Sequence, residues 1–273
     1  MSPAPLPPGL AFTLYAPLAA MGDIAVGERR GGFDRPARSA ILGLVAAALG
    51  YDRHDEEAHR GLDRGYRLAQ RVRARGTLVE DYHTVQAPAA DRKARWATRR
   101  EALAAAKAAR RLETLLSSRE YRADPVVDVV LVCMEEAGPA PDAVADALER
   151  PAYTLSFGRK SCPLGLSPRP VRLTDAAALG PAFGALDQAC PEPAAEILAR
   201  VVPGEGPATL YADADLHPWL RPDYEPVRVE RRRDRVASRR RWQFELRDEI
   251  VAEPRAAEPR AGEPRPAPAV TVP

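Results

Sequence analysis

Residues 153–165 read YTLSFGRKSCPLG and bring a glycine, two cations, a hydroxyl and a cysteine into one short stretch. Arg159 and Lys160 precede Cys162 and could lower the pKa of its thiol, which would create a thiolate nucleophile. A cysteine nucleophile also needs a base, and the sequence suggests none in particular. We therefore interpret Cys162 as a small packing residue, and Arg159 and Lys160 as contacts to an anion.

A glycine-rich loop before residue 39 offers a second place for an anion. Gly22 and Gly27 have the spacing of a phosphate-binding loop, but Glu28 and Arg29 stand where that motif needs Lys and Ser or Thr. A nucleoside-triphosphate site is therefore not expected. Ser39 is a good N-cap, and the free N–H groups and dipole of a helix start favour phosphate. Two interpretations stay open, an anion site built from arginines and a solvated loop.

The histidines and cysteines do not form a metal-binding pattern. His54 and His59 are five residues apart, whereas a metalloprotease helix needs two histidines four apart. The three cysteines include no CxxC pair, which argues against a structural zinc site and a disulfide framework. We expect no metal and no cofactor.

His83, in the segment EDYHT, is a candidate general base for RNA cleavage, because a histidine titrates near neutral pH. No second histidine or lysine stands nearby in the sequence to act as the acid. We favour a histidine that hydrogen-bonds or stacks without catalysing a reaction. An endoribonuclease stays open as the alternative.

Eight arginines lie between Arg228 and Arg241, whereas the whole chain has a formal net charge of only +2. The global charge therefore says little about a nucleic-acid partner, and the local cluster says more. Its alternation with Val229, Val236 and Trp242 predicts a hairpin with one apolar and one cationic side, suited to phosphates. No signal peptide or membrane span is visible in the sequence, so we expect a cytoplasmic protein.

Hydrophobic periodicity and turn residues predict the elements that would position these groups. We expect an α+β fold whose early order of strands and helices is the ferredoxin-like split βαβ pattern, followed by a smaller strand-rich region. The predicted strands cover 10–17, both sides of a bend at Gly76, 125–134 and a hairpin within 226–247; the predicted helices cover 39–49, part of 52–68, 91–118 and 142–150.

Several long segments together resemble a known family. They are PLAAMG, RRGGFDRPARSAILGLVAAALGYDRHD, DYHT, SREYRADPVVDVVL, RPAYTLSFGRKSCPLG and ASRRRW, in this order between about residues 10 and 246. The chain thereby resembles the CasD family, the crRNA 5′-handle-binding subunits of type I-E CRISPR Cascade complexes within the repeat-associated RAMP superfamily.

This resemblance implies a ferredoxin-like, RRM-related domain over 10–84 and 119–157, a thumb insertion over 85–118 and a β-rich C-terminal part over 158–251. The repeated EPRA composition, which has almost no apolar residues to bury, predicts a disordered tail over 252–273. The resemblance also implies an RNA-binding subunit of an antiviral ribonucleoprotein that holds the crRNA 5′ handle, packs against the backbone and large subunits, and meets target DNA only through the complex. It implies no enzyme, although type I-C homologues do cut RNA. A third hypothesis is a protein-interaction module without RNA.

The resemblance also implies a set of RNA-binding residues on loops and helix starts. They are Arg30 and Arg35 in the glycine-rich loop, Arg38 and Ser39 at the first helix, His83 and Arg119 at the thumb base, Arg159, Lys160 and Ser161 in the basic loop, and Ser238 and Arg239 in the hairpin. Tyr82 and Phe33 are candidates for stacking on bases.

Overall fold

The computed structural model describes residues 4–22, 27–90, 95–134, 137–203 and 208–255. Seven strands of this part form one sheet in the order β10-β11-β9-β4-β7-β1-β8. Residues 9–173 include the elements β1 (Gly9–Tyr15), α1 (Arg38–Ala48), β4 (Tyr66–Ala74), β7 (Val126–Cys133), α4 (Pro141–Glu149) and β8 (Val171–Leu173). Their βαββαβ succession, with antiparallel pairing throughout, follows the predicted order, and the α+β fold class is confirmed.

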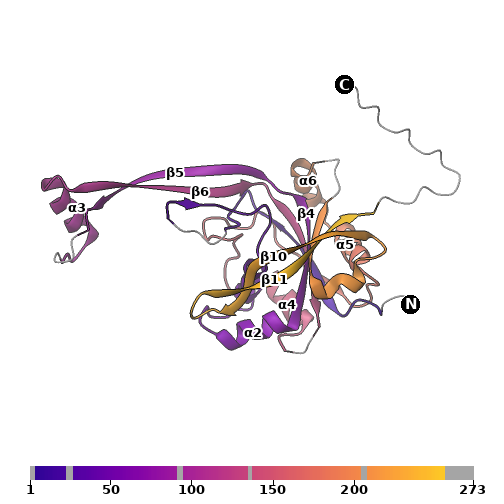
Figure 1. Ribbon diagram of the computed structural model, residues 1–273. Coiled ribbons are helices and arrows are strands. Elements are labelled where there is room, and N and C mark those ends of the chain that lie inside the picture. Colours follow the sequence, from indigo (N-terminus) through magenta and orange to yellow (C-terminus); the bar gives the residue numbers. More distant parts are fainter. Residues whose placement is uncertain (1–3, 23–26, 91–94, 135–136, 204–207, 256–273) are drawn as a thin grey trace, which may run out of the picture.

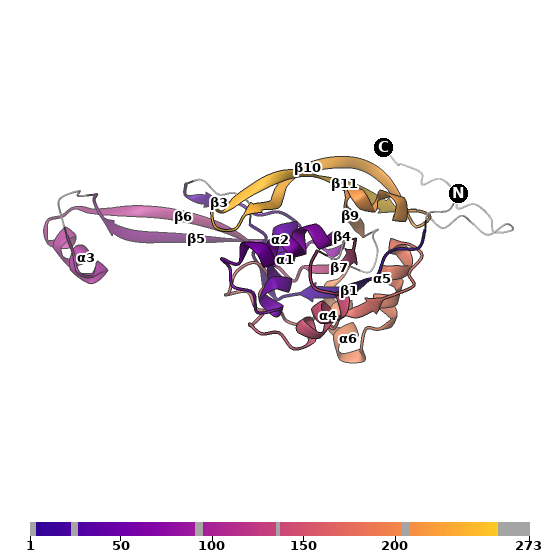
Figure 2. The ribbon, with the colours of Figure 1, turned by 90° about the horizontal axis from the view of Figure 1, so that it is seen from below.

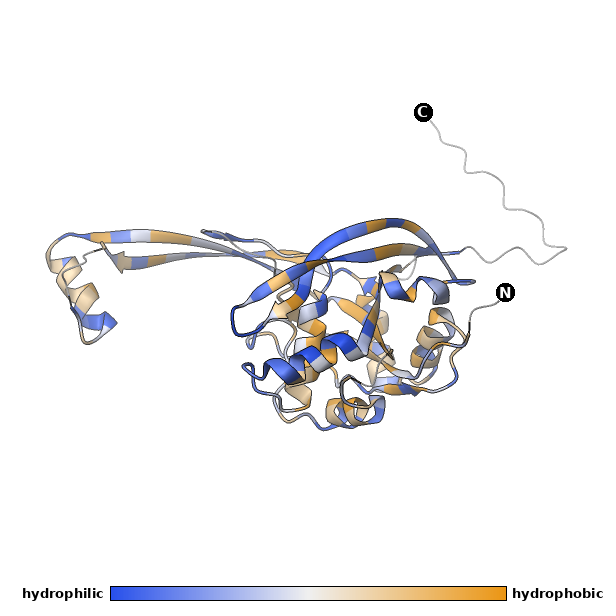
Figure 3. Ribbon diagram, turned by 60° about the horizontal axis from the view of Figure 1, so that its bottom comes forward, coloured by the Kyte–Doolittle hydropathy of each residue, from blue (hydrophilic) through white to orange (hydrophobic). Residues whose placement is uncertain are grey.

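The central strand β7 is buried because the sheet is covered on both faces. Its valine-rich run is buried from Val126 to Val132, and it pairs with β1 on one edge and β4 on the other. Phe12 of β1 packs into a core with α1 and α4, whereas Ala11 points to a second core formed with α5 (Leu179–Gln188). Figure 3 shows hydrophobic residues gathered on the sheet and on the helices that cover it.

Helix α1 begins one residue earlier than the sequence predicted. Ala37 is the N-cap and gives no side-chain capping bond, so the prediction that Ser39 caps the helix is wrong. The end of the helix is as predicted, since Gly50 adopts a φ of 77° that suits glycine. Helix α2 (Glu56–Gly65) follows, and the Asp55 side chain caps it by accepting from the Ala58 N–H.

A long antiparallel hairpin leaves the body of the molecule between β4 and β7 (Figure 1). It consists of β5 (Thr77–Pro88) and β6 (Leu112–Ala123), with α3 (Arg99–Ala108) near its far end. The helix predicted over 91–118 is therefore wrong beyond α3, and residues 91–94 lie outside the described part. Residues 112–118 form a strand instead because they pair with β5, as Leu115 does with Val85. This pairing outweighs the helix preference of the Ala-rich composition.

The other edge of β6 carries two short strands, β2 (Leu18–Ala19) and β3 (Arg29–Arg30). Strand β3 runs parallel to β6 and places Arg30 opposite Arg119. Two far-apart segments, the glycine-rich loop and the base of the hairpin, are thereby joined into one small sheet.

The C-terminal half is less strand-rich than the sequence predicted. It contains helices α5 and α6 (Glu192–Val201) and the 3-10 helix η1 (Ala214–Trp219). The strands β9 (Thr209–Asp213), β10 (Tyr224–Ser238) and β11 (Gln243–Pro254) extend the main sheet. Strands β10 and β11 form the predicted hairpin, which lies across α1 and α2 in Figure 2.

The predicted disordered tail falls outside the described residues except for 252–255. No helix in the described ranges is long and apolar enough to span a membrane.

Candidate nucleic-acid interface

A groove of about 1100 Å³ lies where four distant parts of the chain meet. Its walls are helix α1, the loop around Met21 and Phe33, residues 154–159, and the β10–β11 hairpin. The α1 wall consists of small side chains and one leucine: Ser39, Ala40, Gly43, Leu44 and Ala47. A Cβ on Gly43 would lie 3.2 Å from Nη2 of Arg239, so a glycine lets the arginine approach the helix closely.

The YTLSFGRKSCPLG segment forms a tight turn at one end of the groove. Gly158 has a φ of 92°, and a Cβ there would lie 1.9 Å from the Ala20 carbonyl oxygen. The Phe157 carbonyl accepts from the Ala20 N–H at 3.0 Å, while the Phe157 N–H donates to the Cys162 carbonyl at 2.7 Å. Cys162 is buried, as a packing residue would be.

The basic residues of this turn are not equivalent. Arg159 lines the groove, donates to the Tyr121 hydroxyl at 2.6 Å and lies 5.0 Å from the centroid of that ring. Lys160 and Ser161 are exposed next to the groove without lining it. Of the three predicted contacts, the structure therefore directs Arg159 toward the groove and leaves the other two on its outer surface.

The lining combines cations with flat apolar rings. Two acidic side chains, Asp234 and Glu245, are among the lining residues. The cations and aromatic rings that line it are Arg30, Arg159, Arg232, Arg233, Arg239, Phe33, Phe157, Trp242 and Phe244. A cationic groove with aromatic side chains is the arrangement that binds single-stranded nucleic acid, since it offers partners to both phosphates and bases.

Arg239 is a cation without an acidic partner in the described part of the chain. Its Nη2 donates to the Ser39 carbonyl at 3.3 Å, and its buried Nε has no hydrogen-bond partner there. Burial and repulsion by Arg53 both lower the pKa of Arg239. An anion in the groove would offset this unfavourable charge.

Arg232 is a second poorly compensated cation. It is buried and lies 4.4 Å from the centroid of the Phe33 ring. Its nearest carboxylate oxygens, on Asp234 and Glu249, are 3.6 and 3.7 Å away, and its Nε and Nη2 have no hydrogen bond within the described structure. Burial is the main cause of its lowered pKa.

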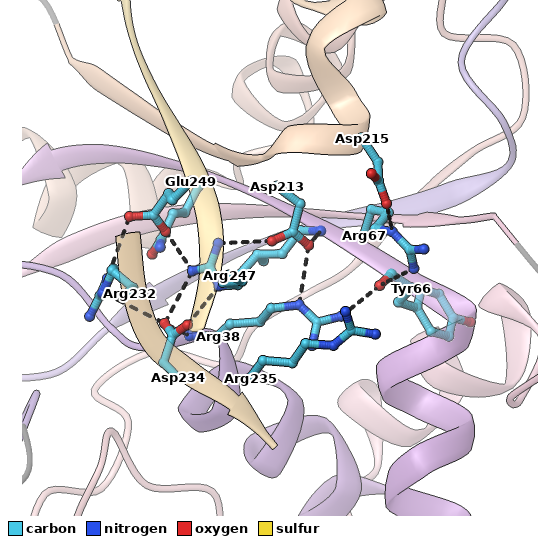
Figure 4. Close-up of polar contacts among 12 residues, drawn as sticks. Arg38, Tyr66, Arg67, Asp213, Asp215, Arg232, Asp234, Arg235, Arg247 and Glu249 are labelled. Carbon is cyan, nitrogen blue, oxygen red and sulfur yellow. Dashed lines mark hydrogen bonds and ion pairs between the residues drawn. The ribbon is translucent and has the colours of Figure 1, made fainter. Parts of the chain in front are cut away.

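Arg35 and Arg38 lie beneath the groove, and the prediction that they contact phosphate is not supported by their surroundings. Arg38 is 3% exposed, ion-pairs with Asp63, and donates through Nε to Asp213 at 3.1 Å (Figure 4). Arg35 donates to Glu249 through Nε at 3.1 Å and Nη2 at 2.6 Å. A buried guanidinium paired with carboxylates is not open to RNA, and both residues join the segment that begins α1 to the sheet.

The same network holds the β10–β11 hairpin in place. Arg247 donates to Asp234 at 2.6 Å, to Asp213 at 2.9 Å and to Glu249 at 2.6 Å (Figure 4). Although burial alone would lower the pKa of Arg247, its bonds to Asp234 and the charges of Asp213 and Glu249 raise it. The groove wall made by the hairpin is therefore fixed before any ligand binds.

The remaining predicted residues are divided between the long hairpin and the β10–β11 turn. His83 is exposed on β5, outside the groove lining, with its Nδ1 3.0 Å from the Asp81 carboxylate. Arg119 lies on β6 beside Arg30 and has a buried Nε without a partner among the described residues. Ser238 donates to Glu56 of α2, and this contact anchors the turn instead of facing the groove. Tyr82 is exposed on the hairpin.

The sequence missed several lining residues, although the alternating arginine run pointed to the correct hairpin. The expected apolar side is wrong, because Val229 and Trp242 are 62% and 56% exposed while Arg232 and Asp234 are buried. The inward side of β10 meets the buried acids rather than an apolar core. Among the lining residues, Phe157 and Phe244 were not singled out from the sequence, and Arg232 and Arg233 were noted only as part of the arginine run.

Residues 9–249 match the model of the family described as CRISPR-associated protein (Cas_Cas5). The chain belongs to the Cas5 family. Over 163 residues it is 29% identical to the CRISPR system Cascade subunit CasD of Escherichia coli (strain K12), a match that covers 57% of this chain and 66% of that relative's length. The resemblance inferred from the sequence is thereby confirmed at the level of the family.

Two solved structures share the fold of this Cas5 protein. One, described as a CRISPR RNA-guided surveillance complex, matches with a TM-score of 0.52 and 21% identity over 90% of this chain and 89% of the other. The second, described as the crystal structure of a Cas protein, matches with a TM-score of 0.52 and 22% identity over 90% and 93% of the two chains. Within the described ranges, no group of three or more His, Cys, Asp or Glu side chains is placed to hold a metal ion.

Proposed function

We propose that this chain is a non-catalytic RNA-binding subunit of a type I-E Cascade complex and that its groove holds the 5′ handle of the crRNA. The observation that carries the proposal is the lining itself, which has five arginines, two acids and four aromatic rings. Membership of the Cas5 family and the name of the E. coli relative, a Cascade subunit, support a place in such a complex. Guanidinium forks bind phosphates and an exposed ring such as Trp242 stacks on a base, so a single strand suits the groove better than a duplex.

The long hairpin supports a second role, contact with a backbone subunit of the complex. Leu78, Tyr82 and Leu115 are largely exposed along it, and Trp96 is exposed near its far end. Apolar side chains on a projecting two-stranded element favour a protein partner that covers them. Tyr82→Glu combined with Leu115→Glu should reduce copurification with the backbone subunits and leave RNA binding in the groove intact. Contact with the large subunit is part of the same proposal.

Absence of catalysis is also proposed. His83 is exposed outside the groove, and the partner that the described structure gives it is the Asp81 carboxylate, not a lysine or a second histidine. Incubating precursor repeat RNA with the purified protein without metal should give no discrete product. A product that disappears in His83→Ala would instead establish an endoribonuclease.

Binding of a repeat-derived handle RNA to the full-length protein tests the main proposal. Arg30→Glu combined with Arg159→Glu should weaken binding by about 100-fold, because each lost charge-assisted contact is worth about tenfold. The matched control is Arg64→Glu with Arg200→Glu, two exposed arginines outside the groove, which should leave affinity nearly unchanged. Equal affinity of both double variants would overturn the assignment of the groove.

A further inference from the structure

Trp242 ends the turn between β10 and β11 in a conformation that a bulky residue rarely adopts. Its φ angle is 54°, in the left-handed region. Hairpin turns favour glycine or asparagine at such positions, since a Cβ substituent is strained there. The tryptophan therefore costs the fold stability that a glycine would not, and strain of this kind points to a functional side chain.

The indole of Trp242 is not part of the core. Its side chain lines the groove while remaining more than half exposed. Phe244 supports it edge-on, with 5.7 Å between the ring centroids and an interplanar angle of 85°. A flat ring that is braced by a second ring and still more than half exposed is suited to stacking on an unpaired base.

Two cations lie over the same ring. The guanidinium carbons of Arg53 and Arg239 are 5.1 and 5.7 Å from its centroid. They repel each other, and Arg239 has no carboxylate partner in the described part of the chain. A phosphate between them would relieve this repulsion, and a base attached to that phosphate would be within reach of the indole.

We propose that Trp242, Arg53 and Arg239 form a subsite for one unpaired nucleotide, with the base stacked on Trp242 and its phosphate bound by the two arginines. This inference rests on the proposed function, and it adds Arg53, in the loop before α2, to the groove residues Arg239 and Trp242. The subsite also explains the strained backbone of Trp242, because this conformation places the ring in the groove.

Trp242→Gly tests the subsite, because it removes the ring and relieves the turn at once. We expect the melting temperature of the full-length protein to stay level or rise. We expect its affinity for the handle RNA to fall about tenfold, as for the loss of one base–aromatic stack. Trp242→Tyr keeps a flat ring and should retain most of the affinity. The control is Trp96→Gly, an exposed tryptophan outside the groove, which should leave RNA affinity unchanged.

An abasic site moved along the RNA identifies the nucleotide. Wild-type protein should lose about tenfold in affinity at one position, and Trp242→Gly should lose no more there because the stack is already gone. Unchanged RNA affinity in Trp242→Gly, or a lower melting temperature with full affinity, would overturn the subsite while leaving the groove assignment in place. Wild-type protein that binds no handle RNA would overturn both.

Discussion

Nη2 of Arg239 donates to the carbonyl oxygen of Ser39 across 3.3 Å, joining residues 200 positions apart in the sequence. This contact brings the tip of the β10–β11 hairpin onto the first turn of α1 and closes one side of the groove. It is also the one hydrogen bond that the described structure gives to a guanidinium whose pKa burial and Arg53 lower. Arg239 is therefore placed for a ligand more than for the stability of the free protein.

Neutralising Arg239 should weaken RNA binding and raise the stability of the free protein. Arg239→Gln removes an uncompensated charge, so we expect the melting temperature of the free protein to rise by about 2–4 °C while affinity for handle RNA falls about tenfold. Thermal denaturation and RNA titration measure the two effects. Arg200→Gln, at an exposed arginine of α6, is the control and should change neither. A melting temperature several degrees lower for Arg239→Gln would assign this residue a structural role.

Asp213 is the acid on which the buried network depends. It accepts from Arg38 at 3.1 Å, Arg247 at 2.9 Å and the Leu68 N–H at 2.8 Å. Asp213→Asn leaves buried guanidinium groups without their counter-charge and should lower the free energy of unfolding by about 3–5 kcal/mol in urea denaturation. Asp215→Asn is the matched control, because that more exposed acid pairs with Arg67 at the surface and should cost at most about 1 kcal/mol. Similar losses for the two variants would contradict the network's role.

Gly158 and Gly184 should respond to alanine in opposite directions. At Gly158 the φ is 92° and the new Cβ would collide with the Ala20 carbonyl, so Gly158→Ala should lower stability by more than about 1 kcal/mol and weaken RNA binding by displacing Arg159. Gly184 lies inside α5 with nothing within 4 Å of the new Cβ, so Gly184→Ala should stabilise the protein by about 0.5–1 kcal/mol. Denaturant titration measures both. Loss of stability in Gly184→Ala alone would be inconsistent with this packing.

His59 predicts a pH dependence of folding. Burial and the charge of Arg239 lower its pKa, although the Asp52 carbonyl at 3.2 Å and the charges of Asp55 and Asp52 oppose the shift. The unfolded chain therefore binds a proton more readily near pH 6.5, and the free energy of unfolding should fall as the pH drops through this value.

The His59 dependence can be isolated with two glutamine variants. His59→Gln should flatten the profile of unfolding free energy between pH 7 and about pH 5, where a neutral buried histidine would otherwise take up a proton on unfolding. His54→Gln, at an exposed histidine of the same segment, should leave the slope unchanged. A slope that persists in His59→Gln would mean that other groups cause it.

The elements that sequence analysis predicted well are those whose pattern is local. Strand β7 and the helices α1 and α2, which the sequence placed at 125–134, 39–49 and within 52–68, each depend on patterns of neighbouring residues. Strand β6 was predicted incorrectly because its register is set by β5, more than twenty residues earlier in the chain. The composition of this segment favours a helix, but pairing with β5 makes it a strand.

For the candidate site, too, local motifs predicted some residues correctly, and long-range packing decided the others. Arg159 and Arg239 were identified from motifs and do line the groove. Arg35 and Arg38 stand in equally basic motifs but are buried, because their partners Glu249 and Asp213 lie 214 and 175 positions away. A sequence gives the type of a side chain, whereas only long-range packing shows whether a cation faces an acid or an open groove. Trp242 carried no local signal for its left-handed backbone.

Photo-crosslinking tests the central claim most directly. A handle RNA carrying 4-thiouridine at successive positions is bound to the full-length protein, irradiated, and the attached peptides are identified by mass spectrometry. The groove assignment predicts crosslinks to residues 154–159 and 232–245, lost when Arg30 and Arg159 are both replaced by Glu. Crosslinks that map instead to the β5–β6 hairpin or to α6, and persist in that double variant, would contradict it.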